Sequence, residues 1–257
     1  MAVKVTFDKN VYEFVVDPEK AGSISDDLRF YYRQINSWID GGKIIPFISE
    51  TILTYEVLSK ESRKSVLSHL QPIVVTSDNN SITISSNPEI HPGNTFYDDI
   101  YLPKAILAGF KILPDRRFGK LINPSVKSEW YYLPDEDYFV TGEKFSAVLR
   151  VLEDLNVGYK AYQNILGGEE IRHSKPFEAV QQFAGTTKKL SAALSERSDG
   201  DSVALHIANE LDYFCTFDQG LSTKQSVFNE KICKLLFEKF SFKKLTPIEL
   251  CAIDRML

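Results

Sequence analysis

The sequence predicts an α/β fold in which helices cover a parallel β-sheet. Two observations lead to this prediction. Near the start of the chain, apolar strand-like segments at 3–7 and 43–48 are each followed by a helical pattern. Near its end, a helix expected at 202–211 precedes a strand at 213–216. Strands that alternate with helices pair in parallel, because each helix carries the chain back across the sheet.

The N-terminal helices are indicated by apolar spacing and by end signals. Residues 26–39 place apolar side chains at helical intervals, and the glycine pair at 41–42 ends that helix. After the second strand, Ser49 is a suitable N-cap for a helix over 50–58. The order strand, helix, strand, helix is therefore expected at the start of the chain.

The middle of the chain has a less regular pattern, and serine, asparagine, proline and glycine interrupt residues 71–95. The expected elements are strands at 73–76, 82–84 and 129–132, an apolar segment at 105–112, and helices at 145–155 and 177–196. We therefore expect a core formed by residues 1–70 and 195–257, interrupted by a mixed insertion at 71–194.

The C-terminal part repeats the order of the N-terminal part. The strand at 213–216 runs toward Asp218, and helical spacing resumes over 225–240. Pro247 is then expected to open a last helical turn, because proline suits the first turn of a helix.

The composition is that of a globular protein. Of the 257 residues, 43% are hydrophobic and 25% charged, and no stretch approaches the roughly 18 apolar residues of a membrane span. The N-terminal segment lacks a signal-peptide pattern, and Cys215, Cys233 and Cys251 form no CxxC pair, which favours the cytoplasm. The net charge of −5 gives no overall attraction to nucleic acid, so phosphate binding would depend on local basic patches.

Acidic residues are expected to gather at one edge of the sheet. Asp8 follows the first strand, Glu50 the second and Asp218 the last, while Asp201 precedes a late helix. Ligands of parallel sheets bind beyond the carboxyl ends of the strands. Taken singly, each aspartate also suits a turn or a helix cap, so the prediction depends on their joint arrangement. Crowded carboxylates raise one another's pKa, and a divalent cation that prefers oxygen ligands relieves this.

Five short segments of the chain together resemble the PIN-domain family of nucleases. They are residues 7–10, 48–56, 199–201, 204–208 and 214–218. The last is the most specific, because a short helix leads into an apolar strand with a threonine two residues before an aspartate. The resemblance implies a parallel-sheet α/β/α sandwich that binds Mg²⁺ or Mn²⁺ and cleaves RNA endonucleolytically.

The resemblance also implies the ligands of the ion. The expected metal ligands are Asp8, Asp201 and Asp218. Asp199 is a substitute or supporting acid. Either Glu50, at the strand-to-helix junction, or Glu56, nearer the family's usual position, completes the catalytic set. At about 100° per residue these glutamates face different sides of a helix, so one of them is expected to bind the ion directly.

Further residues are expected to support the site. Asn10 can orient the Asp8 carboxylate, and Thr216 can orient that of Asp218 or a bound water, although ordinary loop and strand roles remain open for both. Substrate phosphates are expected to contact Arg116, Arg117 and Lys120. Basic residues interleaved with aromatics suit single-stranded RNA, but a solvated loop beside a buried aromatic strand explains the same pattern.

Two other functions remain open from the sequence. One is a PIN-like module that binds RNA or a partner protein without cleavage, and the other is a different metal-dependent phosphoesterase on a doubly wound sheet. The expected partner is an RNA substrate, and an inhibitor protein or a homo-oligomer is compatible with the resemblance. His206, between apolar neighbours on a helix, is interpreted as a packed residue, and the other histidines show no zinc-ligand spacing.

Overall fold

The computed structural model describes most of the chain. The described residues are 2–22, 25–56, 74–77, 82–85, 100–114, 127–133, 138–166, 183–221 and 226–253.

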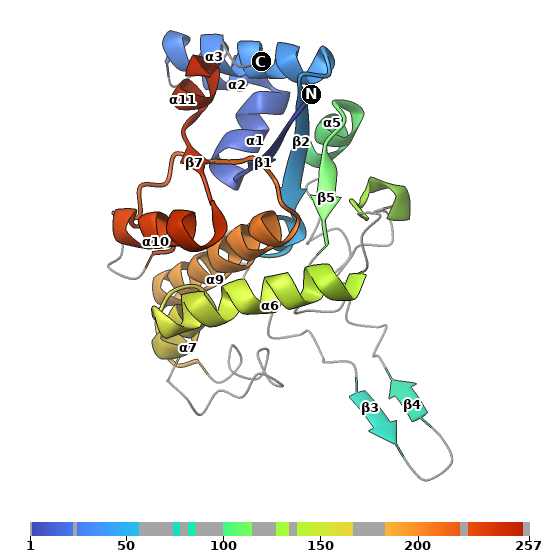
Figure 1. The fold of residues 1–257 in the computed structure, drawn as a ribbon, viewed down its shortest axis with the longest axis vertical. Helices are drawn as coiled ribbons and strands as arrows, with labels where there is room; N and C mark the ends of the chain where they lie inside the picture. Colours follow the sequence, from blue (N-terminus) through green and yellow to red (C-terminus); the bar gives the residue numbers. More distant parts are fainter. Residues whose placement is uncertain are drawn as a thin grey trace.

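In the described part of the chain, the centre of the fold is a five-stranded sheet (Figure 1). In spatial order its strands are β5 (Lys111–Leu113), β2 (Ile44–Ser49), β1 (Val3–Phe7), β6 (Tyr213–Cys215) and β7 (Lys244–Leu245). Every neighbouring pair is parallel, and β1 lies centrally between β2 and β6. The carboxyl ends of these strands therefore share one edge. The predicted α/β class with a parallel sheet is confirmed.

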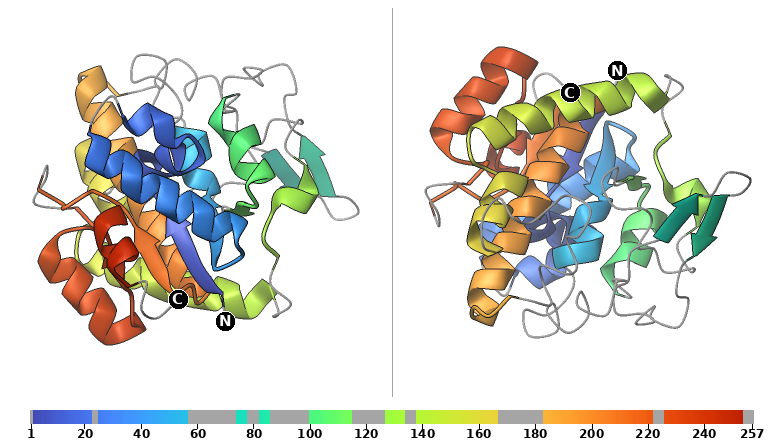
Figure 2. Two further views of the ribbon diagram at one scale, coloured as in Figure 1. Left: turned by 90° about the horizontal axis from the view of Figure 1, so that it is seen from above. Right: turned by 90° about the horizontal axis from the view of Figure 1, so that it is seen from below.

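One face of the sheet is covered by helices from both ends and from the middle of the chain (Figure 2). They are α1 (Lys9–Val16), α3 (Asp26–Asp40), α5 (Tyr101–Leu107) and α11 (Pro247–Ala252), with the short α2 (Pro18–Ala21) packed on α3. Phe7 and Ile48 from the sheet pack with Tyr12 and Ile35 from these helices, and all four are fully buried. This apolar layer anchors α1 beside the end of β1.

The opposite face is covered by helices α6 (Tyr138–Asp154), α9 (Thr187–Ala208) and α10 (Glu230–Phe240), and α7 (Tyr159–Leu166) packs on α9. Phe47 and Phe214 from the sheet join this second layer, together with Leu205 and Leu236. Phe47 and its neighbour Ile48 lie in different layers because successive strand residues point to opposite faces. The sheet is thus sandwiched between two helical layers.

Helix α9 differs from the sequence prediction. The sequence suggested one helix ending at residue 196 and another beginning at 202, but α9 runs without a break through Asp199, Gly200 and Asp201. Gly200 lies against Gly158, and a Cβ added to Gly200 would stand 2.7 Å from the Gly158 Cα. This glycine therefore permits the close packing of α9 on the start of α7, although in the sequence it resembles a helix end.

The middle of the chain takes part in the core. Strand β5 lies within the expected insertion at 71–194, yet it pairs with β2, so that insertion is not separate from the core along its whole length. The strand expected at 129–132 is instead a 3₁₀ turn, Ser128–Trp130, followed by one bridge from Tyr131 to β5.

Farther along the same region, β3 (Val74–Ser77) and β4 (Ile82–Ser85) form an antiparallel pair, close to the two strands expected there. Among the described helices, none has both the length and the apolar character required to cross a membrane.

Candidate metal centre

Asp8 occupies the carboxyl end of the central strand. It follows Phe7 of β1 and is the N-cap of α1, and its Oδ1 accepts a hydrogen bond from the backbone N–H of Lys9 at 2.7 Å. The side chain is only 4% exposed. Aspartate suits an N-cap because its short side chain reaches the unpaired N–H groups of the first helical turn. The strand-to-helix junction therefore places a buried carboxylate at the edge of the sheet.

The other oxygen of Asp8 is held by two side chains. Thr216, which follows β6, donates from its hydroxyl to Oδ2 of Asp8 at 2.6 Å, and Asn10 donates from its amide at 2.9 Å. Asn10 is itself fixed, because its Oδ1 accepts from the backbone N–H of Phe217 at 3.2 Å. The expected contact of Asn10 to Asp8 is thus present, whereas Thr216, which was expected to orient Asp218 or a bound water, instead donates to Asp8 and accepts from the backbone N–H of Asp218.

Glu56 approaches Asp8 from the segment after β2. A helical segment begins at Glu50 and continues as a π-helical turn, Ile52–Glu56, which we call the π-turn. Turns of this kind are rare and often occur at functional sites. Glu50, by contrast, is 5% exposed and accepts a hydrogen bond from the hydroxyl of Tyr131 at 2.8 Å. Of the two glutamates left open by the sequence, the structure brings Glu56 to Asp8.

Helix α9 contributes Asp199, not Asp201. Asp201 is completely buried, and one of its carboxylate oxygens lies 3.7 Å from Nε of Arg197, one helical turn earlier. Two residues on a helix are separated by about 200°, so Asp199 and Asp201 must face different surroundings. The preference for Asp201 as the metal ligand assumed that it begins a helix, whereas both residues lie inside α9. The structure therefore places Asp199, and not Asp201, where the metal ligand was expected.

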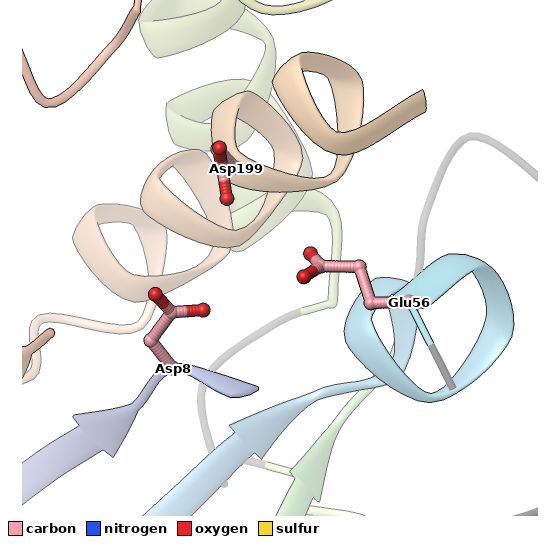
Figure 3. A group of neighbouring side chains, drawn as sticks. All are labelled: Asp8, Glu56 and Asp199. Atoms are coloured by element: carbon pink, nitrogen blue, oxygen red, sulfur yellow. The ribbon is translucent and has the colours of Figure 1, made fainter. Parts of the chain in front are cut away.

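Three carboxylates from distant parts of the sequence meet at this point (Figure 3). Oxygen atoms of Asp8, Glu56 and Asp199 all lie within 4.8 Å of one another. We call these three residues the acidic cluster. Figure 3 shows their carboxylates directed toward one another from the end of β1, the π-turn and α9.

Asp218 stands beside the acidic cluster and is not one of the three residues within that distance. Its Oδ1 accepts from the backbone N–H of Gly220 at 2.6 Å. Asp218 nevertheless lines the same pocket, which has a volume of about 390 Å³. This pocket is lined by Asp8, Lys9, Asn10, Glu13, Phe14, Glu56, Ser195, Asp199 and Asp218.

The concentration of negative charge changes the acidity of the acidic cluster. Burial raises the pKa of Asp8, hydrogen bonds from Thr216 and Lys9 lower it, and the charge of Asp218 raises it further, with a net increase. Burial also raises the pKa of Asp199 well above its ordinary value, and the charges of Glu56 and Asp8 add to this effect. Ionised Asp8 and Asp199 are therefore disfavoured in the folded protein without a nearby cation.

Four residues that line the pocket were not among those predicted from the sequence. Glu13 and Phe14 lie three and four residues after Asn10, on the same face of α1, and Ser195 lies one turn before Asp199 on α9. Helical spacing from a known site residue is the signal that could have found these three. Lys9 has no such signal, because it lies only one residue from Asp8 and from Asn10.

The remaining predicted residues lie elsewhere. Arg116, Arg117 and Lys120 fall outside the described residues. His206 is 1% exposed, shares a hydrogen bond with the Thr6 hydroxyl at 2.8 Å, and contacts the rings of Phe214 and Phe242 edge-on. These contacts are consistent with its interpretation as a packed residue.

Comparison of the chain with protein-family models, curated proteins and solved structures gives no significant match.

Proposed function

We propose that this protein is a metal-dependent ribonuclease of PIN-like type. One observation carries the proposal: Asp8, Glu56 and Asp199 come from three distant segments, and their carboxylate oxygens lie within 4.8 Å of one another at the carboxyl edge of a parallel sheet. Bringing three acids together opposes folding unless their charges are compensated. A bound divalent cation provides such compensation.

The donor atoms of the acidic cluster fit Mg²⁺ or Mn²⁺. All three residues offer carboxylate oxygens, the ligand type that hard divalent cations prefer. The raised pKa values of Asp8 and Asp199 have burial as their largest cause and neighbouring negative charge as a further one, and an ion would oppose both effects. In this proposal Asp8, Glu56 and Asp199 hold the ion, and Asp218 adds negative charge at the side of the pocket.

The protein residues have distinct tasks in this proposal. Thr216 and Asn10 each donate a hydrogen bond to Oδ2 of Asp8 and so fix the direction of its carboxylate. Glu56 and Asp199 complete the oxygen ligands from the π-turn and α9. When bound, the divalent ion lowers the pKa of a coordinated water and offsets negative charge on a phosphodiester.

RNA is the proposed substrate because the segments that form the pocket are those that resemble PIN-domain nucleases. Asp8 and Asn10 belong to the first such segment, and Glu56 ends the second. Contact of Arg116, Arg117 and Lys120 with substrate phosphates stays a prediction.

A PIN-like module that binds RNA or a partner protein without cleavage is the alternative. One observation favours it: among the described residues that line the pocket, five are acidic and Lys9 alone is basic. With a chain charge of −5, the protein offers little attraction to phosphate until cations are bound.

The test is cleavage of a fluorescent single-stranded RNA with Mn²⁺, with Mg²⁺ and with excess chelator. Asp199→Asn removes one charge at nearly constant volume. Asp40→Asn is the matched control, because Asp40 is exposed at the end of α3, shortly before β2 begins at the opposite edge of the sheet. We expect metal-dependent cleavage by wild type and Asp40→Asn, and its loss in Asp199→Asn.

Each other outcome selects a different conclusion. Retention of RNA without cleavage supports the binding module. Hydrolysis of a small phosphodiester alone supports a phosphoesterase of another kind. Equal cleavage by wild type and Asp199→Asn would show that the acidic cluster is not the reacting site.

A further inference from the structure

Lys9 contacts two of the three residues that form the acidic cluster. Its backbone N–H donates to Oδ1 of Asp8 at 2.7 Å, and its ammonium group donates to the backbone carbonyl oxygen of Glu56. Asp8 and Glu56 are 48 residues apart in the sequence, and Lys9 contacts both of them. One residue thus links the start of α1 with the π-turn.

The contact to Glu56 is made at the backbone. A hydrogen bond to a carbonyl oxygen fixes the peptide group from which the Glu56 side chain extends, and it does not involve the carboxylate. The π-turn otherwise packs on α9 and follows β2, and Glu56 is the last residue of that turn. A change in this peptide group would displace the Glu56 carboxylate from Asp8 and Asp199.

Direct binding of substrate is the alternative role for Lys9. It is the single basic residue among the described residues lining the pocket, and a lysine ammonium can bind a substrate phosphate directly. In the structure, however, that ammonium is directed to the Glu56 carbonyl oxygen. The observed contact therefore favours a role in positioning the cluster over a role in binding substrate.

We propose that Lys9 is a positioning residue that holds Glu56 in the acidic cluster through its hydrogen bond to the Glu56 backbone carbonyl oxygen. This inference rests on the proposed function of the acidic cluster as a metal centre. It assigns to a lysine, which repels a metal ion electrostatically, a favourable effect on metal binding.

The sign of the effect separates this proposal from a simple effect of charge. Removing a positive charge beside a cation site strengthens binding of the cation if charge alone acts. Removing a group that positions a ligand weakens binding, by about 10-fold or more for residues that support metal ligands. Lys9→Met keeps the apolar stem and removes the donor, whereas Lys9→Arg keeps both charge and donor.

The experiment measures Mn²⁺ affinity by calorimetry on the full chain. We expect Lys9→Met to weaken Mn²⁺ binding about 10-fold and Lys9→Arg to restore at least half of the loss on a logarithmic scale. Lys43→Met is the matched control, because Lys43 is exposed immediately before β2, at the opposite edge of the sheet, and we expect its affinity to equal wild type within about twofold.

A double variant tests whether the effect passes through Glu56. In a Glu56→Gln background, Lys9→Met should change Mn²⁺ affinity by less than about twofold, because the ligand that Lys9 positions is already impaired. In the protein that carries Lys9→Met alone, an unchanged or higher affinity for Mn²⁺ overturns the proposal. The proposal is also overturned if the only defect of Lys9→Met is a raised KM for RNA, because that result means that Lys9 binds a substrate phosphate.

A measurement on the metal-free protein distinguishes failure of this inference from failure of the proposed function. Amide hydrogen exchange across residues 52–56 should be about 10-fold faster in Lys9→Met than in wild type, with no change in Lys43→Met. If wild type binds no Mn²⁺, the proposed function fails, and the exchange rates still decide whether Lys9 fixes the π-turn. Equal exchange in Lys9→Met and wild type overturns the role of Lys9.

Discussion

Two aspartates on helix α9, Asp199 and Asp201, are two residues apart and lie in opposite kinds of environment. Asp201 is completely buried, and Nε of the buried Arg197 lies 3.7 Å from one of its carboxylate oxygens. Asp199 faces the carboxylates of Asp8 and Glu56, and burial together with their charges raises its pKa well above the ordinary value. The protein itself supplies a positive partner for one charge and gathers more negative charge around the other.

The comparison shows how two residues of one type on one helix can lie in different electrostatic surroundings. The Arg197 guanidinium also lies over the rings of Tyr159 and Tyr162, with its central carbon 4.7 and 5.0 Å from the ring centroids, so Asp201 belongs to a contact between α9 and α7. Removing one partner of a buried ion pair is strongly destabilising, because it leaves the other charge uncompensated. Crowded carboxylates at a pocket disfavour one another's ionised form, which an external cation would relieve.

The largest predicted effect is a loss of stability on substitution of Asp201, whose charge is compensated by Arg197. Asp201→Asn leaves the buried Arg197 without the charge of its near neighbour, and we expect a loss of about 3 kcal/mol in the free energy of unfolding. Urea denaturation at pH 7 measures it. A loss below about 1 kcal/mol would remove the distinction between the two aspartates.

The second effect has the opposite sign. Asp199→Asn removes a charge that the fold disfavours, so the metal-free variant should be more stable than wild type, by about 1 kcal/mol. The same change should reduce metal-dependent RNA cleavage by about 100-fold. Denaturation in chelator and the cleavage rate in Mn²⁺ test the two parts. A destabilised variant would mean that Asp199 is a structural acid like Asp201.

A third buried group on α9, His206, predicts the pH dependence of stability. Burial lowers the pKa of His206 to about 3, from an ordinary value of 6.5. Between these values the unfolded chain takes up a proton that the folded protein does not, so stability is lost as pH falls from about 6.5 toward 3. This group alone should cost about 2 kcal/mol between pH 7 and pH 5.

Asp8 and Asp199 have the opposite effect to His206 on the pH dependence of stability. Their raised pKa values mean that the folded state binds protons more readily than the unfolded state, so they favour folding as the pH falls. The contribution of His206 is therefore obtained as the difference between wild type and His206→Gln, each unfolded in urea at pH 5 and at pH 7. Parallel pH dependences in the two proteins would contradict the prediction.

The smallest effect concerns the residue that orients Asp8. Thr216→Val removes the hydroxyl that donates to Oδ2 of Asp8 at 2.6 Å and accepts from the N–H of Asp218 at 2.9 Å. We expect a loss of about 1 kcal/mol in stability and about 10-fold weaker Mn²⁺ binding. Thr216→Ser keeps the hydroxyl and should match wild type in calorimetry. Equal binding by Thr216→Val and wild type would show that Asp8 needs no orienting group.

Much of the fold follows from local pattern. Residues 3–7 and 26–39 could be predicted as β1 and most of α3, because apolar spacing and the glycines at 41–42 indicate those elements without knowledge of distant contacts. The parallel sheet follows from their alternation. The continuity of α9 could not be predicted in this way, because Gly200 resembles a helix end until its packing against Gly158 is known.

By itself, the sequence indicated that an acid would follow the first strand and that other acids would meet it at the same edge of the sheet. It predicted Asp8 at that edge, with Asn10 as its orienting group, whereas the contact of Thr216 with Asp8 came from the structure. Only the tertiary structure decided between Glu50 and Glu56, and between Asp199 and Asp201. The rotation of each helical segment about its axis selects the side chain that faces the pocket. The hydrogen bond from Tyr131 to Glu50 fixes the first of these segments, and the packing of Arg197, itself on α9, against Tyr159 and Tyr162 of α7 fixes the second.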